Sequence, residues 1–119
     1  MSSTVVSATP AWTIPDYLEV LDGRLSINGA DALELVRKYE SPLFVFSAPR
    51  IKSNINRLKS AAESVEHPIR FFYASKANSN MAVLKTVLDS GIDIEVNSGG
   101  ELFKALRVGF RPEDRKSVV

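Results

Sequence analysis

Apolar residues in this chain form short clusters that alternate with stretches of helical spacing. Leu43–Phe46, Ile69–Ser75 and Ile92–Val96 are compact and mostly apolar, as in strands that are buried on both faces. Between and after them, apolar positions recur three and four residues apart, which is typical of amphipathic helices. The alternation predicts parallel strands joined by right-handed helical crossovers.

The predicted helices have recognisable start and stop signals. Ser47 precedes the first helix, with Pro49 in its first turn, and glycines at positions 91 and 109 end the second and third. The third helix is expected from about Gly100 to Val108, and a fourth strand from Ser117. The apolar faces of the first two helices comprise Ile51, Ile55, Leu58, Ala62 and Val65, and then Met81, Leu84, Val87 and Leu88.

The N-terminal part has a different pattern. Residues 18–27 are two apolar runs joined by Asp22-Gly23, which predicts a β-hairpin. Asp31, with Glu34 three residues later, predicts the start of a short helix that ends near Tyr39 and turns Leu33, Leu35 and Val36 inward. We therefore expect a leader over 1–17, a hairpin and short helix over 18–40, and α/β units over 41–119.

The fold class predicted is α/β, with residues 41–119 forming the opening units of a (β/α)8 (TIM) barrel after a short β segment. A doubly wound sheet fits the same pattern, and the strand order distinguishes the two. A complete barrel takes roughly 200 residues or more. The sequence therefore predicts a truncated barrel that is inactive alone.

Composition narrows the function. The 119 residues carry 15 Lys and Arg against 14 Asp and Glu, with no basic cluster, so nucleic acid is not an expected partner. The chain has no cysteine and one histidine, which excludes disulfides, thiolate metal sites and histidine-rich metal sites. Neither a secretory signal nor a membrane span is evident, and a cytoplasmic location is expected.

Candidate chemistry lies at the predicted carboxyl ends of the strands. Alternation places Ala74 and Lys76 on one face of the second strand, and Glu95 and Asn97 on the matching face of the third. A lysine at a dry strand end can form a Schiff base with an aldehyde. Ala74 leaves room for a planar ring, and Lys76 and Glu95 are expected within reach of each other. On spacing alone, a lysine after a strand is more often a solvated loop residue.

Two motifs at this edge carry a resemblance to a known family. Tyr73–Asn80 and Asn97–Leu102, with the apolar strand after Ser41-Pro42 and with Gly109-Phe110, resemble the fold-type III pyridoxal phosphate-dependent decarboxylases. That family includes the diaminopimelate, ornithine and arginine decarboxylases. The similarity runs from about Leu18 to the C-terminus. It implies a barrel of the alanine racemase-like type, pyridoxal 5'-phosphate as cofactor, an amino-acid substrate and a homodimer.

The resemblance also implies site residues. Lys76 matches the lysine that forms the Schiff base with the cofactor, and Ala74 matches a small residue close to the cofactor ring. Glu95 stands where the diaminopimelate and ornithine enzymes usually carry aspartate, one methylene shorter. The substrate stays open among diaminopimelate, ornithine, arginine and a siderophore-pathway amino acid. Alternatives are a racemase of the same fold, whose pattern the sequence at 78–81 does not match, and a non-enzymatic pyridoxal phosphate homeostasis protein.

Overall fold

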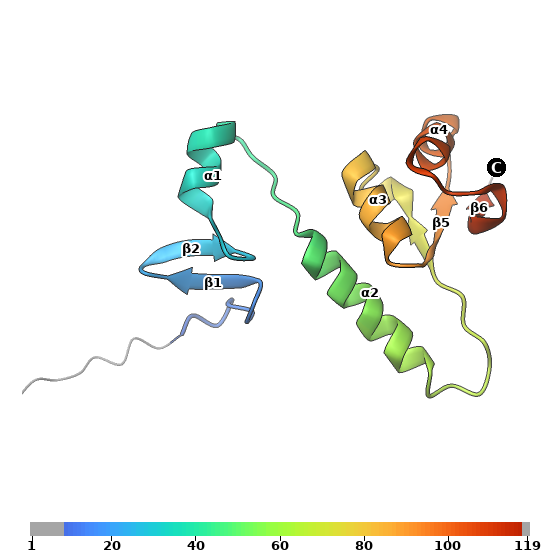
Figure 1. Ribbon diagram of the computed structural model, residues 1–119, viewed down its shortest axis with the longest axis horizontal. Helices are drawn as coiled ribbons and strands as arrows, with labels where there is room; N and C mark the ends of the chain where they lie inside the picture. Colours follow the sequence, from blue (N-terminus) through green and yellow to red (C-terminus); the bar gives the residue numbers. More distant parts are fainter. Residues whose placement is uncertain (1–8, 118–119) are drawn as a thin grey trace, which may run out of the picture. The chain divides into compact units, whose positions relative to one another are not determined.

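The computed structural model describes residues 9–117 and divides into two compact units between Ser47 and Ala48 (Figure 1). The first unit contains the strands β1 (Leu18–Leu21), β2 (Arg24–Ile27) and β3 (Ala30–Asp31) and the helix α1 (Ala32–Tyr39). The second contains α2 (Ala48–Ala62), β4 (Phe72–Ala74), α3 (Met81–Asp89), β5 (Asp93–Val96), α4 (Gly99–Val108) and β6 (Arg115–Ser117). Short 3-10 turns cover Ser75–Ala77 and Pro112–Asp114.

The predicted hairpin is confirmed. β1 and β2 are antiparallel, with Leu21 opposite Arg24, so Asp22 and Gly23 form a two-residue loop. Both loop residues have positive φ, 50° and 74°. This is the turn that matches the twist of paired strands, and Asp-Gly suits it because glycine adopts positive φ without strain.

The start of α1 is also confirmed, but its predicted inward face is wrong. The Asp31 carboxylate accepts hydrogen bonds from the Leu33 and Glu34 amides at 2.8 and 3.2 Å. Leu33 and Val36 nevertheless remain 45% and 41% exposed, and α1 buries none of its residues. Leu35 is half-buried, and an eight-residue helix against a small sheet leaves the other two side chains in contact with water.

The predicted leader lies partly outside the described residues, which begin at Thr9. Its described part contacts the hairpin. Ile14 forms a bridge with Leu18, and the Asn28 amide donates to the Tyr17 carbonyl. None of the helices between residues 9 and 117 combines the length and the apolar character that crossing a bilayer requires.

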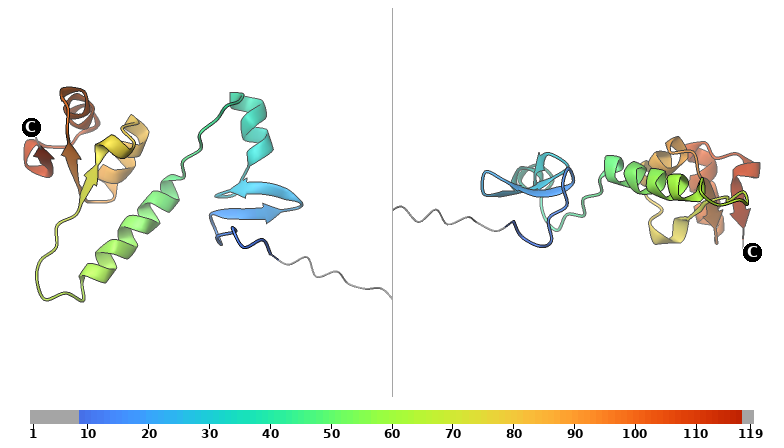
Figure 2. Two further views of the ribbon diagram at one scale, coloured as in Figure 1. Left: turned by 180° about the vertical axis from the view of Figure 1, so that it is seen from behind. Right: turned by 90° about the horizontal axis from the view of Figure 1, so that it is seen from below.

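The second unit is a parallel sheet with helical crossovers, as predicted. The strand order is β4-β5-β6, and both pairs are parallel, with Ala74 beside Glu95 and Val96 beside Ser117. Figures 1 and 2 show β4 and β5 next to each other, with α3 and α4 connecting successive strands. In the opening units of a barrel, strands that follow one another along the chain are also neighbours in the sheet, and β4, β5 and β6 have this order.

The core of the second unit lies between the helices and one face of the sheet. Ile94 and Val96 of β5 are 0% and 2% exposed, whereas Glu95 between them is half-buried. The apolar face of β5 therefore packs against the helices, as alternation predicted. The buried apolar cluster comprises Ile55, Leu84, Val87, Ile94, Val96, Ala105 and Phe110.

The predicted strand at Leu43–Phe46 is wrong, because no strand forms there. Phe44 and Phe46 are 84% and 60% exposed. An apolar run of this kind becomes a strand only when a neighbour accepts its backbone hydrogen bonds, and within the described chain none does. The strand predicted at Ile69–Ser75 is shorter for the same reason: only Phe72–Ala74 meets β5. Val65 lies beyond the end of α2.

Candidate functional site

Lys76 lies in the 3-10 turn that follows β4, at the carboxyl edge of the parallel sheet. The strand alternation stops at Ala74, so the pleat does not decide which way Lys76 faces. The residue is exposed, and among the ion pairs and hydrogen bonds of residues 9–117 none involves its amine. The structure therefore presents a primary amine that is accessible at the strand ends.

Glu95 lies beside Ala74 rather than beside Lys76. The parallel register pairs these two residues across β4 and β5. Lys76 is two positions further on, where the chain has already turned. The ion pairs formed within the described chain do not include Lys76 with Glu95. The expected proximity of the two groups thus does not produce a salt bridge.

The carboxylate that organises this edge is that of Glu101, in the first turn of α4. Its Oε2 atom accepts a hydrogen bond from the Asn97 amide at 2.7 Å and from the Ser75 hydroxyl at 2.8 Å. Ser75 is fully buried, and its hydroxyl is also 2.9 Å from the Glu95 carbonyl oxygen. One side chain thereby joins the residues that immediately follow β4 and β5.

Hydrogen bonding keeps Glu101 charged. The Asn97 amide, and next the Ser75 hydroxyl, lower the pKa of this carboxyl, and partial burial opposes them. The positive charges of Lys76 and Lys104 lower the pKa of Glu101 further. Glu101 and Lys76 nevertheless form no direct ion pair among the described residues.

The chain after Lys76 is fixed by three further interactions. The Tyr73 hydroxyl donates to the Asn78 carbonyl at 3.0 Å, and burial raises the pKa of Tyr73. The Lys104 ammonium, from α4, donates to the Ser79 hydroxyl at 3.0 Å. The Asn80 side chain accepts from the Ala82 amide at 2.9 Å and so caps α3. The segment 75–80 is thus held by β4, α3 and α4.

The residues before α4 leave space and one free donor. Gly99 and Gly100 begin the helix without positive φ, and a side chain at Gly99 would meet no atom within 4 Å. Within the described chain, the glycine pair is therefore not required by steric crowding. The side-chain nitrogen of Asn97 is buried and has no hydrogen-bond partner. An unsatisfied donor of this kind is rare, and a bound acceptor would satisfy it.

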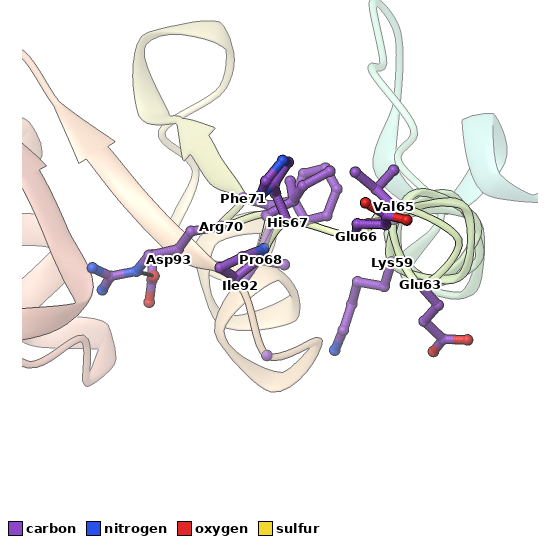
Figure 3. A pocket seen from close by; sticks show the side chains of 13 residues that line it. Lys59, Glu63, Val65, Glu66, His67, Pro68, Arg70, Phe71, Ile92 and Asp93 are labelled. Atoms are coloured by element: carbon purple, nitrogen blue, oxygen red, sulfur yellow. Dashed lines mark hydrogen bonds and ion pairs between the residues drawn. The ribbon is translucent and has the colours of Figure 1, made fainter.

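A surface hollow lies at the other end of the strands from the turn that carries Lys76. Figure 3 shows the side chains that line it. Lys59, His67, Arg70 and Asp93 are among the residues that line it. Arg70 forms an ion pair with Asp93 and donates to the Glu113 carbonyl at 2.8 Å. The hollow opens where β4 and β5 begin, whereas barrel enzymes place their chemistry where strands end. We do not assign it to the candidate site.

Sequence reasoning missed the roles of Ser75, Glu101 and Lys104. At the start of a helix an acid such as Glu101 is favoured by the exposed amides alone, so its position does not by itself indicate a site. The signal available was the spacing Ser98-x-x-Glu101, the form of a capping box. In the structure the Glu101 amide donates to Ser98 Oγ at 3.2 Å, but the Glu101 carboxylate accepts from Asn97 instead of Ser98. No local pattern indicates the hydrogen bond that Ser75 donates to Glu101 or the one that Ser79 accepts from Lys104.

The fold and this edge define the class of protein: the second unit is the N-terminal part of an alanine racemase-like (β/α)8 barrel, with a lysine where a strand ends. Residues 50–115 match the family model described as pyridoxal-dependent decarboxylase, pyridoxal binding domain. The chain belongs to this family.

Similar proteins agree with this assignment. Diaminopimelate decarboxylase of Methanothermobacter thermautotrophicus is 43% identical over 100 residues, which is 83% of this chain and 23% of that protein. The Bacillus subtilis enzyme of the same name is 38% identical, over 76% of this chain and 21% of its own length. A crystal structure of diaminopimelate decarboxylase from M. jannaschii matches with a TM-score of 0.76 and 36% identity, over 86% of this chain and 24% of that one. The chain thus spans about a quarter of the length of these relatives.

Proposed function

We propose that the protein carrying this chain is a pyridoxal 5'-phosphate-dependent amino-acid decarboxylase, a carbon–carbon lyase, and that Lys76 binds the cofactor covalently. The single observation that carries the proposal is the position of Lys76. Its accessible amine follows a parallel strand within the part of the chain that matches the pyridoxal binding domain. That edge is where barrel enzymes place reactive groups.

The residues at this edge fit the cofactor. A primary amine condenses with an aldehyde with loss of water, and Lys76 supplies that amine. The unpartnered side-chain nitrogen of Asn97, Nδ2, can donate to an oxygen of a bound ligand. Ala74, half-buried on β4, has only a methyl group and leaves space for a ring. When bound, pyridoxal phosphate supplies the electron sink for loss of the carboxyl group.

The chain's own residues hold and orient this amine. Glu101 and Ser75 fix the start of the turn that carries Lys76. The Glu101 carboxylate also accepts from the Asn97 backbone N–H, so the same side chain fixes the end of β5 next to this turn. We assign Glu95, beside Ala74 in the register, to the surroundings of the cofactor ring.

We infer that diaminopimelate is the substrate. The support is that the similar proteins at 43%, 40% and 38% identity are named diaminopimelate decarboxylases. One matching structure, at 36% identity, is that enzyme in complex with L-lysine. Ornithine, arginine and siderophore-pathway amino acids are the substrates to be compared.

Assembly and location follow the family resemblance. We infer a cytoplasmic homodimer that acts on an amino acid and does not bind nucleic acid or membranes. We also infer that residues 1–119 alone lack decarboxylase activity, because the similar enzymes are about four times longer. We further propose that residues 1–40 form an N-terminal segment and that residues 41–119 form the first units of the barrel.

The test uses the complete protein loaded with pyridoxal phosphate and reduced with borohydride, followed by peptide mapping. Label is expected at Lys76, and release of carbon dioxide is expected to be faster from diaminopimelate than from ornithine or arginine. Lys76→Arg should abolish both label and carbon dioxide release, whereas Lys85→Arg, an exposed lysine paired with Asp89, should change neither. Label at another lysine, or formation of the mirror-image amino acid without carbon dioxide, would refute the proposal.

A further inference from the structure

Helix α4 contacts the turn that carries Lys76 at two points, one on each side of the lysine. Glu101 accepts from Ser75 at 2.8 Å, immediately before Lys76. Lys104 donates to Ser79 at 3.0 Å, three residues after it. Glu101 and Lys104 are three positions apart in one helix, so they lie on the same face.

Two attachments to one helix restrict the turn more than either does alone. The helix backbone keeps the Glu101 and Lys104 side chains in a fixed relation, and therefore keeps Ser75 and Ser79 in a fixed relation. Lys76 lies between these serines. Displacing the turn requires that at least one of the two hydrogen bonds be broken.

The two attachments also support each other electrically. Both lie in partly buried surroundings, where a charged donor or acceptor forms a stronger hydrogen bond than on an open surface. The positive charge of Lys104 helps to keep the Glu101 carboxyl ionised, as an acceptor for Ser75 and Asn97. Removing the Lys104 ammonium therefore breaks the attachment at Ser79 and takes away one positive charge near Glu101.

We propose that Lys104 is a positioning residue for Lys76, acting through Ser79 and together with the Glu101–Ser75 hydrogen bond. The inference rests on the proposed role of Lys76 as the cofactor-binding lysine. Lys104 itself contacts neither that amine nor any reacting atom among the described interactions.

The experiment uses the complete protein and the variants Lys104→Met, Ser79→Ala and their double variant. Lys104→Met keeps the apolar stem and removes the ammonium. We expect amides of residues 75–80 to exchange with deuterium roughly 10-fold faster or more in each single variant, as for loss of one hydrogen bond to a charged group. The double variant should exchange no faster than either single variant. Trapping of pyridoxal phosphate at Lys76 by borohydride should slow by a similar factor. Lys104→Arg, which keeps a positive charge, should leave the exchange rate and the trapping rate close to those of the unaltered protein. Lys85→Met is the matched exposed control.

The outcomes separate this proposal from the proposed function. Unchanged exchange in Lys104→Met, or additive effects in the double variant, with label still at Lys76, overturns the positioning role alone. If the unaltered protein takes no label at Lys76, the proposed function fails, and the role of Lys104 in the reaction fails with it. Faster exchange and slower trapping, both restored by arginine, support the proposal.

Discussion

Ser75→Ala is the change that most directly tests whether one hydroxyl joins the ends of β4 and β5. Ser75 is fully buried, 2.8 Å from the Glu101 carboxylate and 2.9 Å from the Glu95 carbonyl oxygen. A hydroxyl has one proton, so it donates to one of these acceptors at a time. Alanine removes this donor, so whichever oxygen it serves loses one hydrogen bond.

The expected cost is about 1–2 kcal/mol of local stability. Loss of one hydrogen bond costs about 1 kcal/mol, and more where the acceptor is charged or left unsatisfied in a buried position. Glu101 keeps the Asn97 amide at 2.7 Å, which limits the loss. Replacing a hydroxyl by hydrogen leaves a space too small for a large cavity penalty.

Native-state hydrogen exchange of the Asn97 amide in the complete protein measures this cost. A loss of 1–2 kcal/mol corresponds to roughly 5- to 30-fold faster exchange. Ser64→Ala is the matched control, since the Ser64 hydroxyl is exposed and donates to the Ala61 carbonyl. The control should change exchange less than about 2-fold.

The result that refutes the reasoning is an Asn97 amide that exchanges equally fast in Ser75→Ala and in the control. The Glu101–Asn97 bond would then hold the strand ends without Ser75. Ser75→Ala combined with Glu101→Gln provides a second check. The two changes should be non-additive if the side chains act on each other, and additive if they do not.

Three further outcomes are expected. Hydrogen bonds lower the pKa of Glu101 below its ordinary 4.5, so the stability that its charged form contributes is present above pH 4.5 and is lost as the pH falls through the folded-state pKa. Glu101→Gln should therefore flatten the acid limb of a profile of stability against pH. An unchanged profile would contradict this. Leu84→Ala, at a fully buried position, should cost about 2–5 kcal/mol by urea denaturation, against less than about 1 kcal/mol for Leu106→Ala on the exposed side of α4. Asp31→Ala should speed amide exchange at the start of α1, where the Leu33 amide loses its acceptor, and a helix start that stays protected would count against the cap.

Elements that depend on local chemistry could be predicted from the sequence. The hairpin follows from Asp22-Gly23, since two residues with positive φ suffice to reverse the chain. The start of α1 follows from Asp31, whose side chain accepts from the amide two residues on. Asn80 caps α3 in the same way, although it was not among the predicted caps. In each of these cases the decisive interaction spans only a few residues of the chain.

Elements that depend on a distant partner could not. The apolar run Leu43–Phe46 has the composition of a strand, yet it forms none because no neighbouring strand accepts its hydrogen bonds in the described chain. Alternation placed Lys76 on the face of Ala74, but the strand gives way to a 3-10 turn one residue earlier. A period of two residues holds only as far as the ladder that enforces it.

The position of Glu101 shows how one sequence feature can serve two purposes. At the first turn of a helix an acid is favoured by the exposed amides, and this local reason accounts for the residue without reference to any site. In the structure the same carboxylate accepts hydrogen bonds from Asn97 and Ser75, which come from the ends of two different strands. Both of those groups are donors, and the two lone pairs of Glu101 Oε2 accept them together. A helix cap therefore becomes the connection between two strands and the turn that carries Lys76, and substitution of Glu101 should alter the turn and the strand ends together.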